Sequence, residues 1–335
     1  MRFPVKSATG RGPRCDETKL VTAMRMAYLR IMNAESAPLD RTALSSALLA
    51  HAFWGTMPLY LMLVRSVPPV EFVAWRVVMS LPFCFAIVWA RGMMPEFRAI
   101  LRNRKTVLTL VATSLAIGIN WASYVWAIQT DHVYAASIGY YILPLVMMVL
   151  AHFVLGEHLT KRQWIAAGLA GLGVAALIGG ALSNLWVSLA LASTFAFYGL
   201  MRKTVAAGAM VGLALETLLL LPIAAGVLIW YSMTGPGISF GKEWGTSAAI
   251  MLSAPMTALP LLFFAIAARR LPYSLMGFLQ FLSPSIIFLL GLIIFGEKLA
   301  ANQLVSFVLI WTAAALFLRE MLRRRPKPSK AAGKA

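Results

Sequence analysis

Long apolar segments separated by short polar breaks dominate this chain, and whole windows of about 20 residues carry no charged side chain. Helices of a soluble protein instead place polar residues on one face of every turn. About 20 apolar helical residues suffice to cross the hydrocarbon core of a bilayer. The pattern therefore predicts an all-α polytopic membrane protein with ten transmembrane helices, near residues 43–64, 70–90, 106–128, 133–155, 163–180, 183–201, 211–231, 246–268, 273–295 and 302–319.

Composition supports the same class of protein. Hydrophobic residues make up 60% of the 335 positions and charged residues only 13%, and mean hydropathy is +0.77. Soluble domains carry about 25% charged residues, so a soluble fold is excluded. Of the two cysteines, Cys15 lies in the N-terminal tail and Cys84 in the predicted second span. We therefore expect no disulfide, no metal site and no cofactor.

Basic residues predict the direction of the spans, because cytoplasmic loops accumulate Lys and Arg. With ten spans and both termini in the cytoplasm, most of the 30 Lys and Arg residues fall on the cytoplasmic side. Residues 1–40 and 320–335 are then basic cytoplasmic tails, of which the first is expected to be disordered, with Met24 or Met26 as an alternative start. Topology thus explains the net charge of +18, so we expect membrane lipids as partners and no nucleic acid.

One stretch of sequence occurs twice. Residues 139–159 read GYYILPLVMMVLAHFVLGEHL and residues 279–299 read LQFLSPSIIFLLGLIIFGEKL, which align at a constant offset of 140 positions. Five predicted spans lie in residues 41–180 and five in 181–319. Because an odd number of spans reverses direction, the second unit would be an inverted copy of the first. Inverted repeats are frequent in secondary transporters, where exchange of the two conformations gives alternating access.

Several motifs carry a resemblance to a known family: WGTMPLY (54–60), INWASYVWAI (119–128), ASIGYYILPL (136–145) and STFAFYGLMRK (193–203). The chain resembles the RarD branch of the EamA transporters, within the drug/metabolite transporter superfamily. This resemblance implies ten helices in two EamA repeats, a location in the bacterial inner (plasma) membrane and export of small molecules. The family pattern often has Asn where this chain has Leu143 and Met147, so no substrate is carried over from the resemblance.

Two charged residues inside the predicted spans, Arg76 and Glu216, are the first candidates for the transport pathway. Burial of a charge in the bilayer costs roughly 2.5–3.5 kcal/mol on insertion scales, which favours a functional role. They occupy matching positions in the two halves, yet their expected depths differ by on the order of 13 Å. We expect each to lie near its own gate rather than to pair with the other. Helix packing or snorkelling to the interface is the alternative.

Neutral polar and aromatic residues complete the predicted pathway. They are expected to line a mostly apolar cavity suited to amphipathic, aromatic or zwitterionic solutes, although each aromatic alone also fits a core or an interfacial belt. His51 is either a titratable group or a satisfied polar core residue. The lining residues are Trp54, Asn120, Trp121, Tyr124, Trp126, Tyr140, Tyr141, Tyr198 and Gln280.

Repeat-matched residues also suggest structural roles. Pro144 and Pro284 are predicted hinges, with a static kink as the alternative, because proline removes one helical hydrogen bond. Glu157 and Glu297 are predicted to cap the helix that follows each of them.

Taken together, these features favour a secondary transporter that exports small organic metabolites or drugs by alternating access, with proton coupling or exchange. A flippase for a lipid-linked substrate is the alternative. An enzyme is not expected, because the spans contain few converging His, Asp and Glu residues, and no Walker A motif is present. Substrate identity, the coupling ion and association into a homodimer stay open at this stage.

Overall fold

The computed structural model describes residues 40–129, 133–178, 185–234, 237–294 and 301–323. All regular structure in these residues is helical, so the all-α prediction is confirmed. Glu297 and most of both predicted tails lie outside the described residues. The helices are α2 (Arg41–Leu61), η1 (Met62–Val64), α3 (Pro69–Ala90), α4 (Met94–Arg102), α5 (Arg104–Gln129), α6 (Val133–Phe153), α7 (Lys161–Ile178), α8 (Leu185–Thr204), α9 (Ala209–Thr234), α10 (Trp244–Arg270), α11 (Tyr273–Leu279), α12 (Leu282–Ile293) and α13 (Ala301–Arg323).

Eight helical segments of the described chain are long and apolar enough to cross a membrane, and residues 137–153 form a shorter apolar helix. Every predicted span overlaps a helix, and the ninth overlaps two, α11 and α12. The multi-pass membrane character is confirmed. Helix α7, which begins with Lys161 and Arg162, is not among the eight. The count of ten crossings and the cytoplasmic position of both termini stay predictions.

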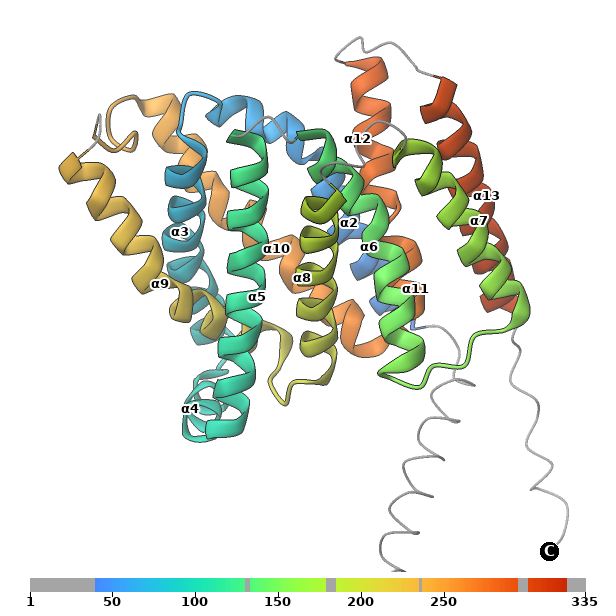
Figure 1. The fold of residues 1–335 in the computed structure, drawn as a ribbon. Helices are drawn as coiled ribbons and strands as arrows, with labels where there is room; N and C mark the ends of the chain where they lie inside the picture. The colour runs from blue at the N-terminus through green and yellow to red at the C-terminus, as the bar shows by residue number, and fades with distance from the viewer. Residues whose placement is uncertain (1–39, 130–132, 179–184, 235–236, 295–300, 324–335) are drawn as a thin grey trace, which may run out of the picture. The chain divides into compact units, whose positions relative to one another are not determined.

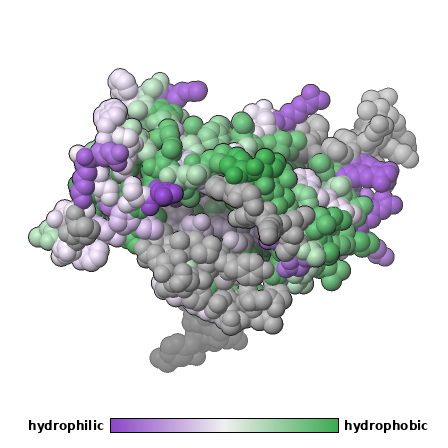
Figure 2. All heavy atoms as spheres, turned by 90° about the horizontal axis from the view of Figure 1, so that it is seen from above, coloured by the Kyte–Doolittle hydropathy of each residue, from purple (hydrophilic) through white to green (hydrophobic). Residues whose placement is uncertain are grey.

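The surface of the bundle is rich in large apolar side chains. Trp89, Phe153, Met233 and Ile293 are each more than 70% exposed. In the view of Figure 2, hydrophobic residues cover much of the visible face, and hydrophilic residues gather toward its margins. Water would disfavour so much exposed apolar area, whereas lipid tails accept it without penalty.

Helix packing follows the same pattern in both halves of the chain. Helices α7 and α13 lie side by side, and so do α3 and α9 (Figure 1). Helix α2 packs against α10 and α12, and α8, its counterpart in the second half, packs against α5 and α6. Likewise, α3 contacts α10 as α9 contacts α5. Exchange of the two halves therefore reproduces these contacts, although α8 also contacts α10 and α2 makes no comparable contact with α5.

The ninth predicted span is interrupted where the fourth is continuous. Helix α11 ends at Leu279 and α12 begins at Leu282, and the backbone N–H of Gln280 bonds to the carbonyls of Met276 and Gly277 at 3.2 and 3.1 Å. Pro284 has no N–H to donate to the Gln280 carbonyl, which weakens the helix at this point. Pro144, its matched residue, lies inside the unbroken α6. The two candidate hinges thus lie in different local structures, one in a continuous helix and one beside a break. Their motion stays a prediction.

Close contact between α6 and α11 depends on a missing side chain. A Cβ atom at Gly277 would lie 2.9 Å from the Pro144 carbonyl oxygen and 3.1 Å from the Met147 Cβ. Leu143 and Met147 are fully buried. The two positions at which the chain departs from the family pattern therefore contribute apolar packing in the core.

Glu157 joins the two halves of the chain. Its carboxylate accepts the backbone N–H groups of Tyr273 at 2.5 Å and Ser274 at 3.0 Å, and the Ser274 hydroxyl at 2.7 Å. The prediction that Glu157 caps the following helix, α7, is therefore wrong, because Glu157 caps α11. Helix α7 is capped by Thr160 and Gln163, each of which accepts the other's backbone N–H. This reciprocal arrangement is a capping box.

We expect Glu157→Ala to lower the free energy of unfolding by about 1–2 kcal/mol, because α11 loses the acceptor for its first N–H groups. Denaturant titration of the protein in detergent micelles measures this change. Glu320→Ala is the matched control, since its carboxylate pairs at 3.3 Å with an Arg162 side chain that is 68% exposed. Exposed pairs contribute little, so equal losses in the two variants would contradict the assigned cap.

Candidate functional site

A small cavity of about 20 Å³ lies among α3, α5, α8, α9 and α10. Arg76 and Glu216, the two predicted intramembrane charges, both line it. Its lining is also paired between the halves of the chain, because five pairs of residues occupy matching positions at the 140-residue offset. The pairs are Arg76 and Glu216, Val77 and Thr217, Ser80 and Leu220, Ile117 and Thr257, and Trp121 and Leu261.

Arg76 is held by one hydrogen bond and one ring. Its Nε donates to the Thr257 hydroxyl at 2.9 Å, and its guanidinium carbon lies 5.0 Å from the centroid of the Trp121 ring. A cation over an aromatic face is a favourable arrangement. Tyr124 and Tyr140, whose rings are 6.0 Å apart, lie within electrostatic range of the same guanidinium. These residues bring together α3, α5, α6 and α10.

Glu216 pairs with a cation that the sequence had suggested to be a loop residue. Its Oε1 lies 3.5 Å from Nη1 of Arg202, which is fully buried. Tyr198 donates its hydroxyl to the other carboxylate oxygen at 3.4 Å, and Nη2 of Arg202 donates to the Ala209 carbonyl at 2.8 Å. As expected from the sequence, Glu216 and Arg76 form no ion pair with each other within the described chain.

Small residues at the start of α9 make room for this buried cation. A Cβ atom at Gly212 would clash with Nη1 of Arg202. The run AAGAMVG (206–212) before Glu216 was the available signal, but small residues near a helix start have many uses. Arg202 could therefore be recognised as a partner only from the side-chain contacts that join α8 to α9.

Reciprocal bonds join the α8–α9 loop to the α10–α11 loop. Lys203 at the end of α8 donates to the carbonyls of Ala268 and Leu271 at 3.1 and 2.5 Å. Arg269 at the end of α10 donates to the carbonyls of Val205, at 3.0 Å, and Ala207. Together with the bonds of Glu157 to the start of α11, these bonds close the end of the bundle that the predicted topology places in the cytoplasm.

Comparison with known proteins identifies the family. The EamA-like transporter family matches residues 41–179. The uncharacterized transporter PA0485 of Pseudomonas aeruginosa is 40% identical over 284 residues, which cover 84% of this chain and 95% of that protein. Protein RarD of Escherichia coli is 33% identical over 291 residues, which cover 85% and 96%. The chain belongs to the RarD branch of the EamA transporter family.

A solved structure agrees with this fold. A chain in a crystal structure aligns with a TM-score of 0.66 at 18% identity, covering 84% of this chain and 98% of that chain. At this level of identity the likeness concerns the fold alone.

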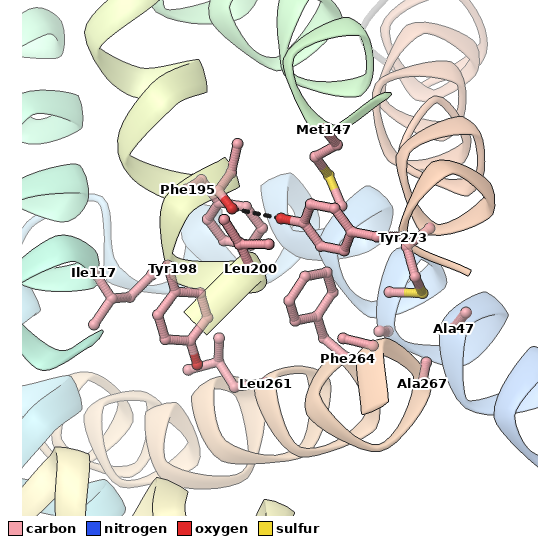
Figure 3. Packing of buried hydrophobic residues seen from close by; sticks show 14 of the residues in the cluster. Ala47, Ile117, Met147, Phe195, Tyr198, Leu200, Leu261, Phe264, Ala267 and Tyr273 are labelled. Atoms are coloured by element: carbon pink, nitrogen blue, oxygen red, sulfur yellow. Dashed lines mark hydrogen bonds between the residues drawn. The ribbon is translucent and has the colours of Figure 1, made fainter. Parts of the chain in front are cut away.

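In this RarD-branch protein, a cluster of aromatic side chains packs beside the cavity. The ring of Trp54 lies 5.6 Å from those of Phe195 and Phe264, and Tyr198 stacks on Phe264 at 6.4 Å. Tyr273, at the start of α11, donates its hydroxyl to the Ala196 carbonyl next to Phe195 (Figure 3). The cluster thus extends from the cavity lining at Tyr198 to the closed end of the bundle.

Other predicted pathway residues lie apart from the cavity. Asn120 is buried and donates its side-chain amide to the Leu191 carbonyl and the Thr194 hydroxyl, both at 2.9 Å, so it joins α5 to α8. Trp126 contacts Trp186 at 5.3 Å, and both rings are exposed, as expected of an interfacial belt.

Tyr141 lines a second cavity of about 170 Å³ among α6, α7, α12 and α13. The polar part of its lining comes mainly from Ser137, Ser285, Gln303 and Ser306. Arg76 and Glu216 do not line it. The structure therefore places Tyr141 away from the paired cavity, although Tyr140 beside it lies near Arg76.

His51 and Gln280 are buried polar residues with unpaired atoms. The Ser283 hydroxyl donates to the His51 carbonyl at 3.1 Å, and the same oxygen lies 3.1 Å from Nδ1 of His51. That oxygen has given its only hydrogen to the carbonyl, so we assign the imidazole hydrogen to Nδ1. Within the described residues, Nε2 of His51 and Oε1 of Gln280 have no hydrogen-bond partner. His51 is thus only partly satisfied.

Matching residues of the two halves differ in burial. Each of the first-half residues is half-buried, whereas none of their counterparts is more than 5% exposed. Val77, Ser80 and Ile117 are as buried as their counterparts, so the first half of the site is partly exposed only at the four positions that follow, whereas the second half is packed shut. The pairs are Arg76 and Glu216, Trp121 and Leu261, Tyr124 and Phe264, and Tyr140 and Gln280.

We expect Arg202→Gln and Glu216→Gln each to lower the free energy of unfolding by about 3–5 kcal/mol, because each leaves one buried charge without its partner. The double variant removes both charges and should lose less than the sum of the two. Equilibrium unfolding of the four proteins in detergent micelles gives the coupling energy. Strictly additive losses would contradict a direct interaction between Arg202 and Glu216.

Proposed function

We propose that this protein is a secondary transporter of the bacterial inner membrane that exports small organic metabolites or drugs by alternating access. The paired cavity is the observation that carries this proposal, because transporter sites typically lie at the interface between repeats. Its polar groups are few and its remaining lining is apolar, which suits small organic solutes. Its volume of about 20 Å³ requires that it widen before such a solute can enter. Membership of the RarD branch supports the same class of activity.

The proposed architecture has ten spans, in two inverted repeats over residues 41–180 and 181–319, with both termini in the cytoplasm. The largely symmetric set of helix contacts and the matched cavity lining support it. Such repeats can exchange conformations, so that residues packed shut in one state become accessible in the other.

We propose further that the described conformation faces outward. Residues of the first half around Arg76 are partly exposed, whereas their second-half counterparts are buried under the aromatic cluster. The bonds of Lys203, Arg269 and Glu157 close the predicted cytoplasmic end. Opening toward the cytoplasm would require that these bonds break together and that the aromatic rings separate.

Glu216 is the residue through which protons could drive transport. It is the acidic residue that lines the paired cavity, and its carboxylate holds Arg202 by charge. Protonation would remove that charge and release the buried guanidinium, which couples a proton to rearrangement of α8 and α9. Exchange of one solute for another, without protons, is the alternative form of coupling.

Counterflow into proteoliposomes tests the proposed function. Vesicles loaded with an unlabelled metabolite mixture should accumulate a labelled solute transiently when the reconstituted protein exchanges it, and empty vesicles should not. Solutes for this assay come from a comparison of culture media of overexpressing and deleted strains. Movement of labelled lipid alone, with no soluble counterflow, would replace the exporter by the flippase.

Cysteine labelling from each side tests the outward-facing state. In a background with Cys15 and Cys84 replaced by serine, Tyr140→Cys should react with a membrane-impermeant thiol reagent added from the periplasmic side of oriented vesicles. Gln280→Cys, its repeat-matched control, should react much more slowly from either side because it is buried. Faster labelling of Gln280→Cys from the cytoplasmic side would contradict the assignment.

A further inference from the structure

Arg76 lies well inside a predicted span and has no protein anion as its partner, whereas three other arginines of the described chain do. Arg202 pairs with Glu216, Arg270 with Asp40, and Arg162 with Glu320, at 3.3–3.5 Å. Among the described residues, Arg76 pairs with no carboxylate, and its two terminal nitrogens have no hydrogen-bond acceptor. A half-buried cation inside a predicted membrane span is costly without an anion. The missing anion therefore points to a ligand.

The guanidinium is already oriented for such a ligand. The bond from Nε to Thr257 and the contact with the Trp121 ring fix the plane of the group. The two terminal nitrogens then form the planar fork that binds both oxygens of a carboxylate. Because the contacts use the ring face and Nε, they leave this fork free.

Three phenols, Tyr60, Tyr124 and Tyr140, lie within electrostatic range of the Arg76 guanidinium, and the Tyr60 hydroxyl already donates to the Ala249 carbonyl at 2.8 Å. Tyr124 and Tyr140 are half-buried, lie within electrostatic range of Arg76, and have hydroxyl groups without a hydrogen-bond partner in the described chain. Each hydroxyl can donate one hydrogen bond to an oxyanion. Glu216 does not neutralise this end of the cavity, since Arg202 already compensates its charge.

We propose that Arg76, Tyr124 and Tyr140 form an oxyanion subsite, and that the transported solute carries a carboxylate which binds there with an apolar or aromatic body against Trp121. This inference rests on the proposed transport function and names its substrate class. One guanidinium compensates one negative charge, so monocarboxylates fit better than solutes with several charges. The second-half counterparts Glu216, Phe264 and Gln280 offer no equivalent cation, so the subsite belongs to the first half of the chain.

Binding of matched carboxylates and amides tests the subsite without a need for transport. The probes are benzoate, 3-phenylpropionate and indole-3-acetate, each compared with its neutral primary amide, added to the full chain in detergent micelles. Titration calorimetry gives affinities, and a rise in unfolding temperature checks them. We expect at least one carboxylate to bind about tenfold or more tightly than its amide.

Variants then locate the binding. Arg76→Gln should weaken binding of that carboxylate about tenfold or more and abolish the preference over the amide, whereas Arg76→Lys should retain part of it. Tyr140→Phe removes only a hydroxyl, so it should weaken the carboxylate severalfold without effect on the amide. This milder variant keeps the test valid if Arg76→Gln fails to fold. Arg162→Gln, at an exposed arginine, is the matched control and should bind as wild type does.

Different results would overturn the oxyanion subsite and the proposed transport function. Equal affinity for acids and amides, no binding of any of the three acids, or unchanged affinity in Arg76→Gln or in Tyr140→Phe would overturn the subsite and leave the transporter assignment intact. Binding that depends on Arg76, together with an absence of counterflow for every solute tested, would support the subsite and count against transport.

Discussion

A membrane interior supplies no water to a buried charge, so each charged side chain in this bundle needs a partner in the protein or in a solute. Glu216 finds Arg202, at 3.5 Å and in full burial. Arg76 finds only a hydroxyl and an aromatic face. At two matched positions of the cavity, the second half of the chain therefore places a charge that is compensated by an ion pair, and the first half places a cation without an anion.

The two halves therefore share a scaffold but not a chemistry. Most contacts between helices recur between the matching helices, and matching positions line the paired cavity. Different side chains occupy these positions: arginine opposes glutamate, tryptophan opposes leucine, and Tyr124 opposes Phe264. A scaffold of this kind can keep the two-state motion of a symmetric transporter while it confines solute recognition to one side of the pseudosymmetric site.

The predicted cytoplasmic end of the bundle is closed by hydrogen bonds to backbone N–H and carbonyl groups that the helix ends leave without an intrahelical partner. Carboxylate oxygens of Glu157 accept N–H groups at the start of α11, and Lys203 and Arg269 donate to carbonyls beyond the ends of α10 and α8. Helix termini have free donors and acceptors of this kind by necessity. Because these bonds join separate helices, they can break and form again without a loss of secondary structure.

Much of the fold was readable from the sequence, because a bilayer imposes a length and an apolar character on every helix that crosses it. The constant offset between the halves also identified Arg76 and Glu216 as matched residues, and both line one cavity. Pro144 and Pro284 show the limit of such matching: the same residue at the same offset lies in a continuous helix in one half and beside a break in the other.

The sequence by itself determined the helices, the doubling and the candidate charges, since hydropathy and offset are properties of the chain in order. Tertiary structure alone decided the partners. Arg202 follows the predicted span 183–201 and is identified as a partner only by its contact with Glu216. Glu157 is predicted from the sequence to cap the next helix, yet its carboxylate accepts the backbone N–H of a residue 116 positions away. Such contacts depend on which helices meet, and a membrane span carries almost no sequence record of its neighbours because lipid and protein favour similar apolar side chains.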